Sequence, residues 1–394
     1  MNTDPIVIVS AKRTPMGHFN GYFKDIAAPA LGGHAISAAL LEAPDCFDNI
    51  DAVYMGCVLS AGLGQAPARQ AALAAKLPNR TPCVTVNKMC GSGMQALMFA
   101  YRDILSGCAN IVVAGGMENM SRAPFLLLDA RAGLRFGNQT LMDHMVIDGL
   151  TNAYDPRESM GKLAENCASK MHITREHQDA FAMASCKRAM DATQKGLFSA
   201  EIAAISVQTK NGAVFVEKDE GIEKVQLEKI PTLKPAFSPD GTITAANASS
   251  ISDGAAALLL MRESMAKKLN LTPLAKIVGD HAVAQEPEWF STTPILAVQQ
   301  LLEKIKWSVN DVDLFEINEA FAVVALATMK SLAIPFDKIN IHGGACVLGH
   351  PIGASGARIV VTLIHALKQL NKKRGVAALC IGGGEATAMA IEIV

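Results

Sequence analysis

This sequence has few aromatic residues and no large excess of charge of either sign. Aromatic residues make up 5% of the 394 residues and charged residues 19%, and 36 Lys and Arg nearly cancel 37 Asp and Glu. The even balance excludes a broadly basic nucleic-acid binder, although a local basic patch could still hold an anionic ligand. Apolar residues make up 50% of the chain. We therefore expect a globular protein of two or three domains or subdomains.

Long apolar runs and paired cysteines are absent as well. No run approaches the roughly 20 residues that span a bilayer, which predicts no membrane partner. The first residues, MNTDPIVIVSAKRTP, lack the basic and apolar segments of a signal peptide. The nine cysteines, at positions 46, 57, 83, 90, 108, 167, 186, 346 and 380, form no CxxC pair. This pattern favours reduced thiols in a cytoplasmic protein over disulfides or a zinc site.

Short apolar segments alternate with helical ones, which predicts an α/β fold. Residues 121–245 differ from the rest, because they are richer in charge and turn signals, and Asn211-Gly212 there predicts a hairpin. This region is either an inserted loop domain that covers a site or an ordinary surface insertion. We expect strands at 6–10, 51–59, 84–88, 312–317 and 376–381, and helices at 28–41, 66–76 and 175–195.

The two halves of the chain carry similar units. In each, a small-residue turn is followed by an amphipathic helix, an apolar strand and a glycine-rich turn that ends near a glutamate. The spacing from Gly356 to Gly382 exceeds that from Gly93 to Gly115, and the additional length coincides with a polar insert at Asn371–Arg374. We interpret the pattern as a duplicated βα unit. Chance similarity between two α/β segments is the alternative.

Cys90 lies between a predicted strand and an amphipathic helix, in the segment Cys90-Gly91-Ser92-Gly93. The start of a helix combines the positive end of its dipole with free N–H groups, and both favour the thiolate form of a cysteine. The position therefore predicts a nucleophile. A buried thiol that only packs is the alternative.

Three further residues stand beside turns at predicted strand or helix ends. His350 precedes a helix, where a neutral imidazole could take a proton from a thiol. Cys380 ends a strand, and active groups of open α/β sheets gather at the carboxyl ends of strands. Asn318 also follows a strand and either orients a water or the histidine, or caps the next helix. Each has a purely structural alternative, but together with Cys90 they predict one catalytic cleft. A cysteine protease would leave Cys380 without a role.

Several segments, in the same order and from end to end of the chain, resemble the thiolase family, specifically its acetyl-CoA acetyltransferases. They are SAKRTPMG, VNKMCGSGMQAL, GGMENMS, SMGKLAEN, TAANASSISDGAAALLLM, INEAFA, GGACVLGHPIGASGAR and CIGGGEATAMAIE.

The resemblance implies a role for each residue of the predicted cleft. Cys90 corresponds to the nucleophile that carries the acyl group, His350 to its base, and Cys380 to the acid/base at the α-carbon of the second acyl group. Asn318 holds a water that forms one oxyanion hole with His350, and the N–H groups of Cys90 and Gly382 form another. Further positions are implied to bind the acyl group or coenzyme A, namely Ser249, Met160, Phe290, Ala320, Phe321, Leu150 and Ala245.

The resemblance also implies the architecture. The thiolase fold places duplicated βα halves in five αβαβα layers with an inserted loop domain. We expect an N-terminal half at 1–120, completed by about 246–270, a loop domain at 121–245 that covers the coenzyme A site, and a C-terminal half at 271–394. Family members are homo-oligomers, and for this chain a tetramer is favoured over a dimer.

The activity that the resemblance implies is the reversible Claisen condensation of two acetyl-CoA to acetoacetyl-CoA plus CoA, through an acetyl-cysteine, without metal or redox cofactor. A degradative 3-ketoacyl-CoA thiolase of broad chain length is the alternative, and a non-catalytic thiolase-like protein that binds acyl-CoA is less favoured. Phe290 is typical of members that use potassium, but Cys186 replaces a tyrosine that helps to bind that ion, so a potassium requirement stays open. His342 and Glu385 also depart from the family pattern.

Overall fold

A single mixed sheet forms the frame of the molecule. The structure, a computed structural model, describes residues 4–210 and 212–394. Among these residues a ten-stranded sheet has the order β12-β13-β14-β11-β1-β10-β5-β3-β4, and β2 pairs with β10. The strands are β1 (Ile6–Arg13), β2 (Gly17–His18), β3 (Ala52–Gly56), β4 (Cys83–Val86), β5 (Ile111–Asn119), β10 (Ser252–Arg262), β11 (Ala275–Ala284), β12 (Leu314–Ile317), β13 (Arg374–Ile381) and β14 (Glu385–Ile393).

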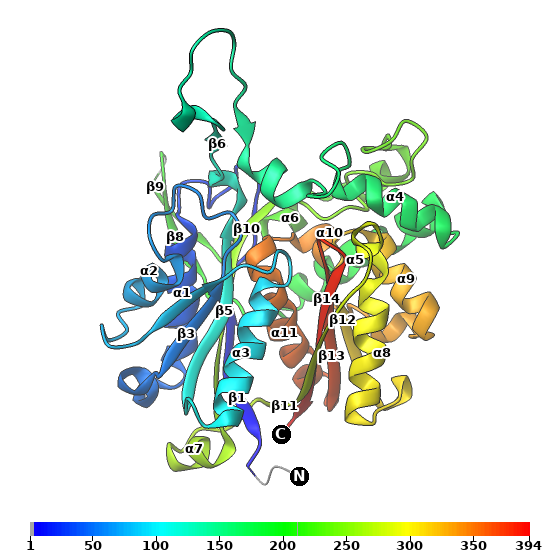
Figure 1. Ribbon diagram of the computed structural model, residues 1–394. Coiled ribbons are helices and arrows are strands. Elements are labelled where there is room, and N and C mark those ends of the chain that lie inside the picture. Colours follow the sequence, from blue (N-terminus) through cyan, green and yellow to red (C-terminus); the bar gives the residue numbers. More distant parts are fainter. Residues whose placement is uncertain (1–3, 211) are drawn as a thin grey trace.

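The helices divide this sheet into two halves and complete five layers (Figure 1). Helices α3 (Ser92–Ser106) and α11 (Ile352–Gln369) lie between the halves. Helices α1 (Ala28–Leu41) and α2 (Pro67–Ala74) cover the outer face of one half, and α8 (Thr293–Ile305) and α9 (Ala322–Leu332) cover the other. Within the sheet of the described residues, the strands of the two halves join where β1 pairs with β11, a register of two residue pairs.

The strands are apolar on both faces because helices cover both. In β5, Val112 and Ala114 belong to the central core with α3 and α11, whereas Ile111 and Val113 belong to the outer core with α1. Continuous apolar strands of this kind are typical of sheets that are buried on both sides.

The crossing of α3 and α11 is made possible by the two glycines that the repeat places in equivalent positions. A Cβ on Gly93 would lie 2.8 Å from the nitrogen of Ala357, and one on Gly356 would lie 2.4 Å from the nitrogen of Met94. Only glycine allows so close an approach of two backbones. As a result, the first turns of the two helices, which follow Cys90 and His350 in the chain, pack against each other in the central layer.

Much of residues 121–245 lies above the end of the sheet at which α3 and α11 begin, whereas residues 205–209 and 212–216 lie beside the half that α1 covers (Figure 1). They hold α4 (Met160–Lys170), α5 (Arg175–Gln194), α6 (Glu220–Glu223) and two small antiparallel pairs, β6 (Phe125–Leu126) with β7 (Met142–Asp143) and β8 (Ile205–Thr209) with β9 (Gly212–Val216). The β8–β9 pairing confirms a hairpin, although Asn211 itself lies outside the described residues. Helix α4 was not predicted. The proposed domain limits stay a prediction.

Short helical segments complete the chain. They are η1 (Pro44–Asn49), η2 (Met120–Arg122), η3 (Ala130–Ala132), η4 (Val146–Leu150), η5 (Leu227–Thr232), α7 (Glu263–Lys268), η6 (Pro287–Thr292), η7 (Val309–Asp311), η8 (Phe336–Lys338) and α10 (Ala345–Leu348). Within the part of the chain that the structure describes, no helix has both the length and the apolar character needed to cross a membrane.

Candidate active site

A tight turn before α3 presents Cys90. The side chain of Ser92, the first residue of the helix, donates a hydrogen bond to the carbonyl of Met89 at 2.6 Å and accepts one from the N–H of Lys88 at 2.9 Å. Met89 has a φ of 46°, in the left-handed region. These bonds fix the turn, so that Cys90 is held at the start of the helix with its side chain half-buried.

Burial dominates the ionisation of Cys90. It raises the pKa of the thiol to about 11, although the N–H groups of Gly382 and of Cys90 itself hydrogen-bond to the sulfur and act in the opposite direction. The negative charge of Glu118 raises this pKa further. The expectation that the helix start favours the thiolate is therefore wrong for the resting protein, because desolvation outweighs the nearby N–H groups. Cys90 needs a base.

His350 has the properties of such a base. Burial lowers the pKa of His350 to about 3, and the positive charge of Arg358 acts in the same direction, so the imidazole is neutral near pH 7. Its Nδ1 lies 2.6 Å from the hydroxyl of Ser355, which donates its own hydrogen to the carbonyl of Pro351 at 3.0 Å. A hydroxyl engaged in this way can accept a hydrogen from Nδ1, and that tautomer would leave the lone pair on Nε2. Among the described residues Nε2 has no hydrogen-bond partner.

Asn318 lies beside this imidazole at the end of β12. Its Nδ2 is 3.4 Å from Nδ1 of His350, and its Oδ1 is 3.4 Å from Nη2 of Arg358. Phe321, not Asn318, occupies the N-cap position of α9, so the capping interpretation of Asn318 is wrong. The neighbouring Glu319 is buried and accepts three hydrogen bonds from surrounding groups, which gives it a structural role.

Cys380 approaches Cys90 from the other half of the chain. It lies near the end of β13, and the turn that follows contains Gly383 and Gly384 with φ values of 94° and 84°. Burial, and then the charge of Cys90, hold the pKa of the Cys380 thiol well above its usual value. The β13–β14 hairpin thus brings a second thiol and the N–H of Gly382 to Cys90.

An apolar wall surrounds the two cysteines. Phe290 and Phe321 stack edge to face with their ring centres 6.4 Å apart, and they share a core with Cys380 and Ala320. Met160, the first residue of α4, packs against the same core, and a Cβ on Gly382 would lie 3.6 Å from its Cε. Leu150 packs with Cys90 in a separate, smaller cluster. Of the seven predicted substrate contacts, Met160, Phe290, Ala320 and Phe321 thus share a core with Cys380, and Leu150 packs in the cluster of Cys90.

The predicted coenzyme A contacts divide between the backbone and a cavity. The N–H of Ser249 donates to the carbonyl of Ala320 at 2.9 Å, and the carbonyl of Ser250 accepts the N–H of His350 at 3.2 Å. Ala245 and Ser250 line a cavity of about 270 Å³, whereas Ser249 does not. The cavity also holds three basic side chains, His18, Lys224 and Lys229, and both Cys186 and Cys346. Ser250 therefore connects a basic cavity with His350.

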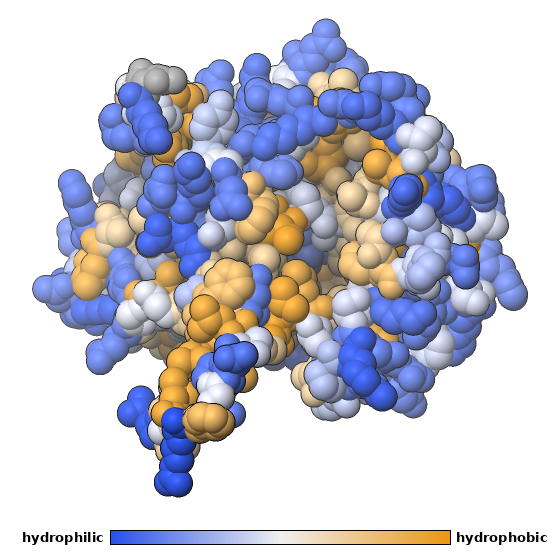
Figure 2. Space-filling model, turned by 90° about the horizontal axis from the view of Figure 1, so that it is seen from above, coloured by the Kyte–Doolittle hydropathy of each residue, from blue (hydrophilic) through white to orange (hydrophobic). Residues whose placement is uncertain are grey.

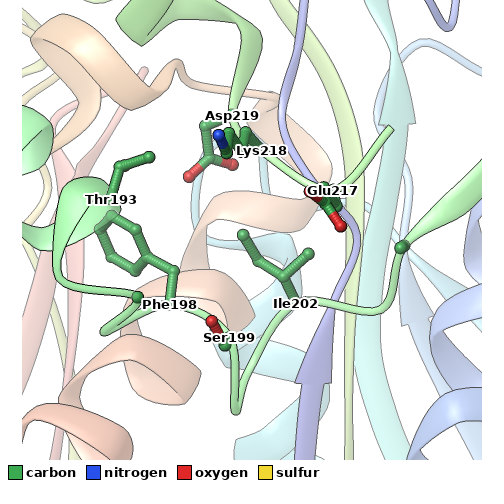
Figure 3. A pocket seen from close by; sticks show the side chains of 9 residues that line it. Thr193, Phe198, Ser199, Ile202, Glu217, Lys218 and Asp219 are labelled. Carbon is green, nitrogen blue, oxygen red and sulfur yellow. The ribbon is translucent and has the colours of Figure 1, made fainter. Parts of the chain in front are cut away.

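A second cavity lies apart from these residues. Figure 3 shows Phe198, Ile202 and Asp219 around it, at the end of α5 and in the segments that follow. Residues of the predicted site do not line it. We assign the chemistry to the region around Cys90.

Comparisons with known families and proteins identify the family of the chain. The thiolase N-terminal domain family matches residues 6–264, and the thiolase C-terminal domain family matches residues 271–393. The chain belongs to the thiolase family. The predicted family and fold are confirmed, and the protein is an acyltransferase.

Relatives of this thiolase cover its whole length. A probable acetyl-CoA acetyltransferase of Dictyostelium discoideum is 48% identical over 99% of this chain and 94% of its own. Acetyl-CoA acetyltransferase 2 of Arabidopsis thaliana is 48% identical over 100% and 98%. A probable acetyl-CoA acyltransferase of Staphylococcus aureus is 46% identical over 98% of both chains.

Two solved structures match the fold over nearly the whole chain. Acat5 thiolase from Ascaris suum, solved in complex with coenzyme A, has a TM-score of 0.94 and 41% identity over 99% of this chain and 100% of its own. The acetyl-CoA acetyltransferase of Bacillus anthracis has a TM-score of 0.96 and 39% identity over 99% of both chains.

Sequence reasoning missed residues of this thiolase that contact the predicted site residues or their loops. Ser355 and Arg358 are buried polar residues on α11 that contact His350 and Asn318. Polar residues on a helix that is otherwise buried and apolar were the available signal. Lys88 and Glu385, which form an ion pair, were visible only as separate charges next to the two cysteine motifs.

Proposed function

We propose that the protein is an acetyl-CoA C-acetyltransferase, which condenses two acetyl-CoA reversibly to acetoacetyl-CoA and CoA. The observation that carries the proposal is that the helices following Cys90 and a neutral His350 pack closely at their starts, and that Cys380 lies near enough to Cys90 to feel its charge. The names of the most similar relatives support acetyl-CoA as the substrate.

The first half-reaction transfers an acetyl group to Cys90. Nε2 of His350 takes the thiol proton, and the sulfur attacks the thioester carbonyl. The C–S bond to CoA then breaks. Cys380 gives its proton to the departing CoA thiolate, which leaves acetyl-Cys90, a protonated His350 and a Cys380 thiolate.

The second half-reaction forms the carbon–carbon bond. The Cys380 thiolate takes a proton from the methyl group of a second acetyl-CoA, and the resulting enolate attacks the carbonyl of acetyl-Cys90. The Cys90 sulfur leaves and recovers its proton from His350. Every group of the protein returns to its starting state, and acetoacetyl-CoA is released.

Two sets of donors stabilise the negative oxygens that form in these steps. The N–H groups of Cys90 and Gly382 already point to the Cys90 sulfur and are suited to the oxygen of its thioester. A water on Asn318, with His350, is suited to the enolate oxygen of the second substrate. Fixed donors need no reorganisation as charge develops, and each contributes roughly 3 kcal/mol to a lower barrier.

The basic cavity beside His350 is the proposed site of coenzyme A. CoA is an anionic thioester carrier, and Lys224 and Lys229 supply positive charge to a cavity that also contains Ala245 and Ser250. The complex of a similar thiolase with coenzyme A supports CoA as a ligand of this fold. No metal or redox cofactor takes part in the proposed steps, and Cys186 offers no oxygen ligand for potassium.

A 3-ketoacyl-CoA thiolase of broad chain length is the second candidate, favoured by the acyltransferase name of the Staphylococcus relative. The buried ring of Phe290 beside Cys380 argues for a short pocket instead. A protein that binds acyl-CoA without catalysis is disfavoured, since it would have no use for two thiols and a neutral imidazole held together.

We infer a cytoplasmic homotetramer with a role in lipid metabolism. All nine cysteines are free thiols, which supports a reducing compartment. Residues of the protruding segment around β6 and β7 expose apolar side chains, which supports assembly of subunits.

The decisive experiment is the capture of the acyl intermediate. Wild-type protein mixed with acetyl-CoA should gain one acetyl group on the peptide that contains Cys90, as mass spectrometry detects. Cys90→Ala should gain none and should lose both condensation and thiolysis. Acetylation of Cys83 or Cys108 instead would refute the assignment.

A further inference from the structure

Lys88 and Glu385 form an ion pair between the two loops that meet at Cys90. Lys88 lies two residues before Cys90, and Glu385 is the first residue of β14. Their side chains are 24% and 38% exposed. The two loops come from opposite halves of the chain, so this contact ties one half to the other.

The backbone around Lys88 couples its position to that of Cys90. The carbonyl of Lys88 accepts the N–H of Gly91 at 3.0 Å, and its own N–H donates to the hydroxyl of Ser92 at 2.9 Å. Both bonds close the turn that holds Cys90. A displacement of Lys88 would therefore move the nucleophile.

Glu385 is coupled in the same way to the other loop. It pairs with Ile381 in the register of β13 and β14, and so closes the turn that carries Gly382. The two loops are in direct contact, because a Cβ on Gly91 would lie only 2.3 Å from Cδ1 of Ile381. Small changes in their spacing are thus transmitted to Gly382.

We propose that Lys88 and Glu385 are positioning residues that hold the N–H of Gly382 at the sulfur of Cys90, a role that rests on the proposed acyl transfer. The N–H groups of Cys90 and Gly382 belong to different loops, so an oxyanion hole made of both requires that the loops keep their spacing. A half-exposed ion pair adds little to folding stability. Misplacement by about 1 Å at a reacting centre, in contrast, can cost about 100-fold in rate.

A purely electrostatic role would give a different pattern of effects. Loss of the positive charge of Lys88 would disfavour a thiolate at Cys90, whereas loss of the negative charge of Glu385 would favour it. The two single variants would then change the reactivity of Cys90 in opposite directions. A positioning role predicts a loss in both, and recovery when the charges are exchanged.

The test measures the rate of Cys90 acetylation by acetyl-CoA in Lys88→Met, Glu385→Gln and the exchange variant Lys88→Glu/Glu385→Lys. Each single variant should be about tenfold slower, a change of about 1.4 kcal/mol in barrier, with KM nearly unchanged. The exchange variant should recover most of the rate. Lys276→Met is the matched control and should keep the wild-type rate, because the Lys276–Glu392 pair has similar exposure (41% and 22%) and joins β11 to β14.

Three results would overturn the proposal. The first is an acetylation rate of the single variants within about twofold of the wild type. The second is a rate that rises in one single variant and falls in the other. The third is an exchange variant that is acetylated no faster than the single variants. Thermal melting of each variant checks that it is folded. A wild-type protein that acetyl-CoA does not acetylate at all would instead overturn the proposed function, so the two failures are distinguishable.

Discussion

In the proposed mechanism, the reactivity of Cys90 depends on a proton transfer from a neutral thiol to a neutral imidazole. Burial raises the pKa of Cys90 to about 11 and lowers the pKa of His350 to about 3. The reactive form, a thiol beside a neutral imidazole, therefore persists over the whole range between these values. A cysteine protease relies instead on a thiolate–imidazolium pair, in which the cysteine has a depressed pKa.

This difference predicts the pH dependence of the first half-reaction. The rate of Cys90 acetylation should be constant from about pH 5 to about pH 9. At lower pH the rate should fall as His350 takes a proton, and at higher pH it should change as the thiol ionises. Alkylation by iodoacetamide, which needs the thiolate, should continue to rise beyond about pH 9. Stopped-flow acetylation and alkylation followed over pH measure both. An alkylation midpoint below about pH 8 would contradict the neutral pair.

Cys380→Ser should separate the two half-reactions. In the proposed second step Cys380 removes the α-proton as a thiolate, and a serine hydroxyl ionises far less readily than a thiol, so it would supply almost no anion at neutral pH. Acetylation of Cys90 should fall less, because a CoA thiolate can leave without a proton. We expect a single-turnover experiment to show acetyl-Cys90 and condensation that is at least about 100-fold slower, or about 2.7 kcal/mol.

Cys167→Ser is the control for this variant. Cys167 is also a fully buried thiol in the same apolar core as Cys380, so its replacement reports the cost of a hydroxyl in that core without touching the chemistry. Condensation by Cys380→Ser within about tenfold of the wild type would exclude the acid/base role.

The elements that carry these residues differ in how well the sequence predicts them. Helix α1 spans Ala28–Leu41 as predicted, because Pro29 at its start and a run of small apolar residues define it locally. Strand β3 ends at Gly56, not Leu59. The N–H groups of Val58 and Leu59 leave the ladder and donate to the buried carboxylate of Glu118, a partner distant in sequence.

The site shows the same division between local and tertiary information. Cys90, His350 and Cys380 could be proposed as site residues because glycine-rich turns mark them in the sequence. The ionisation of Cys90 could not be predicted, since a helix start is a local feature and desolvation depends on the whole fold. Helix α4, which begins at Met160, was missed because its short sequence MGKLAENCASK mixes polar and apolar residues, and packing against the rest of the chain decides its conformation.

The segment η6 (Pro287–Thr292) is proposed to set the length of the acyl pocket through Phe290. The ring is buried against Phe321 and near Cys380, where it would block a longer chain. We predict high activity on acetoacetyl-CoA and a steep loss by six or eight carbons, since each misplaced methylene costs roughly 1–3 kcal/mol. Phe290→Ala should raise the ratio of kcat/KM for the eight-carbon over the four-carbon substrate.

Thiolysis of 3-ketoacyl-CoAs of increasing length measures this ratio. Phe290→Met is the control, since it removes the ring but keeps a side chain of similar length, and it should retain the short-chain preference. Equal kcat/KM for four and eight carbons in the wild type would favour the degradative alternative.

The chain exposes apolar side chains on a segment that protrudes from the body. Figure 2 shows apolar side chains along this segment, and Figure 1 locates it at β6 and β7. Phe136 is fully exposed and Leu134 and Leu141 are exposed as well. Burial of apolar surface contributes about 25 cal/mol per Å², so the segment supplies a strong contact when subunits associate.

We therefore predict that the double variant Leu134→Glu/Phe136→Glu converts a tetramer into a dimer. Each glutamate would place a charge in the apolar contact, where desolvation disfavours it. Light scattering coupled to size exclusion measures the mass of the particle. Acetylation of Cys90 should remain within about twofold of the wild type, because the substitutions lie outside the residues around the two thiols.

Leu41→Glu tests whether any exposed leucine would have this effect. Leu41 is 80% exposed at the end of α1, away from the protruding segment, and its substitution should leave the mass unchanged. A wild type that is already a dimer, or a Leu134→Glu/Phe136→Glu variant that stays a tetramer, would show that this apolar segment does not assemble the subunits. Loss of acetylation together with loss of mass would instead indicate that the segment helps to hold the loop region over the site, because the same chain continues from β7 through η4 to Leu150 beside Cys90.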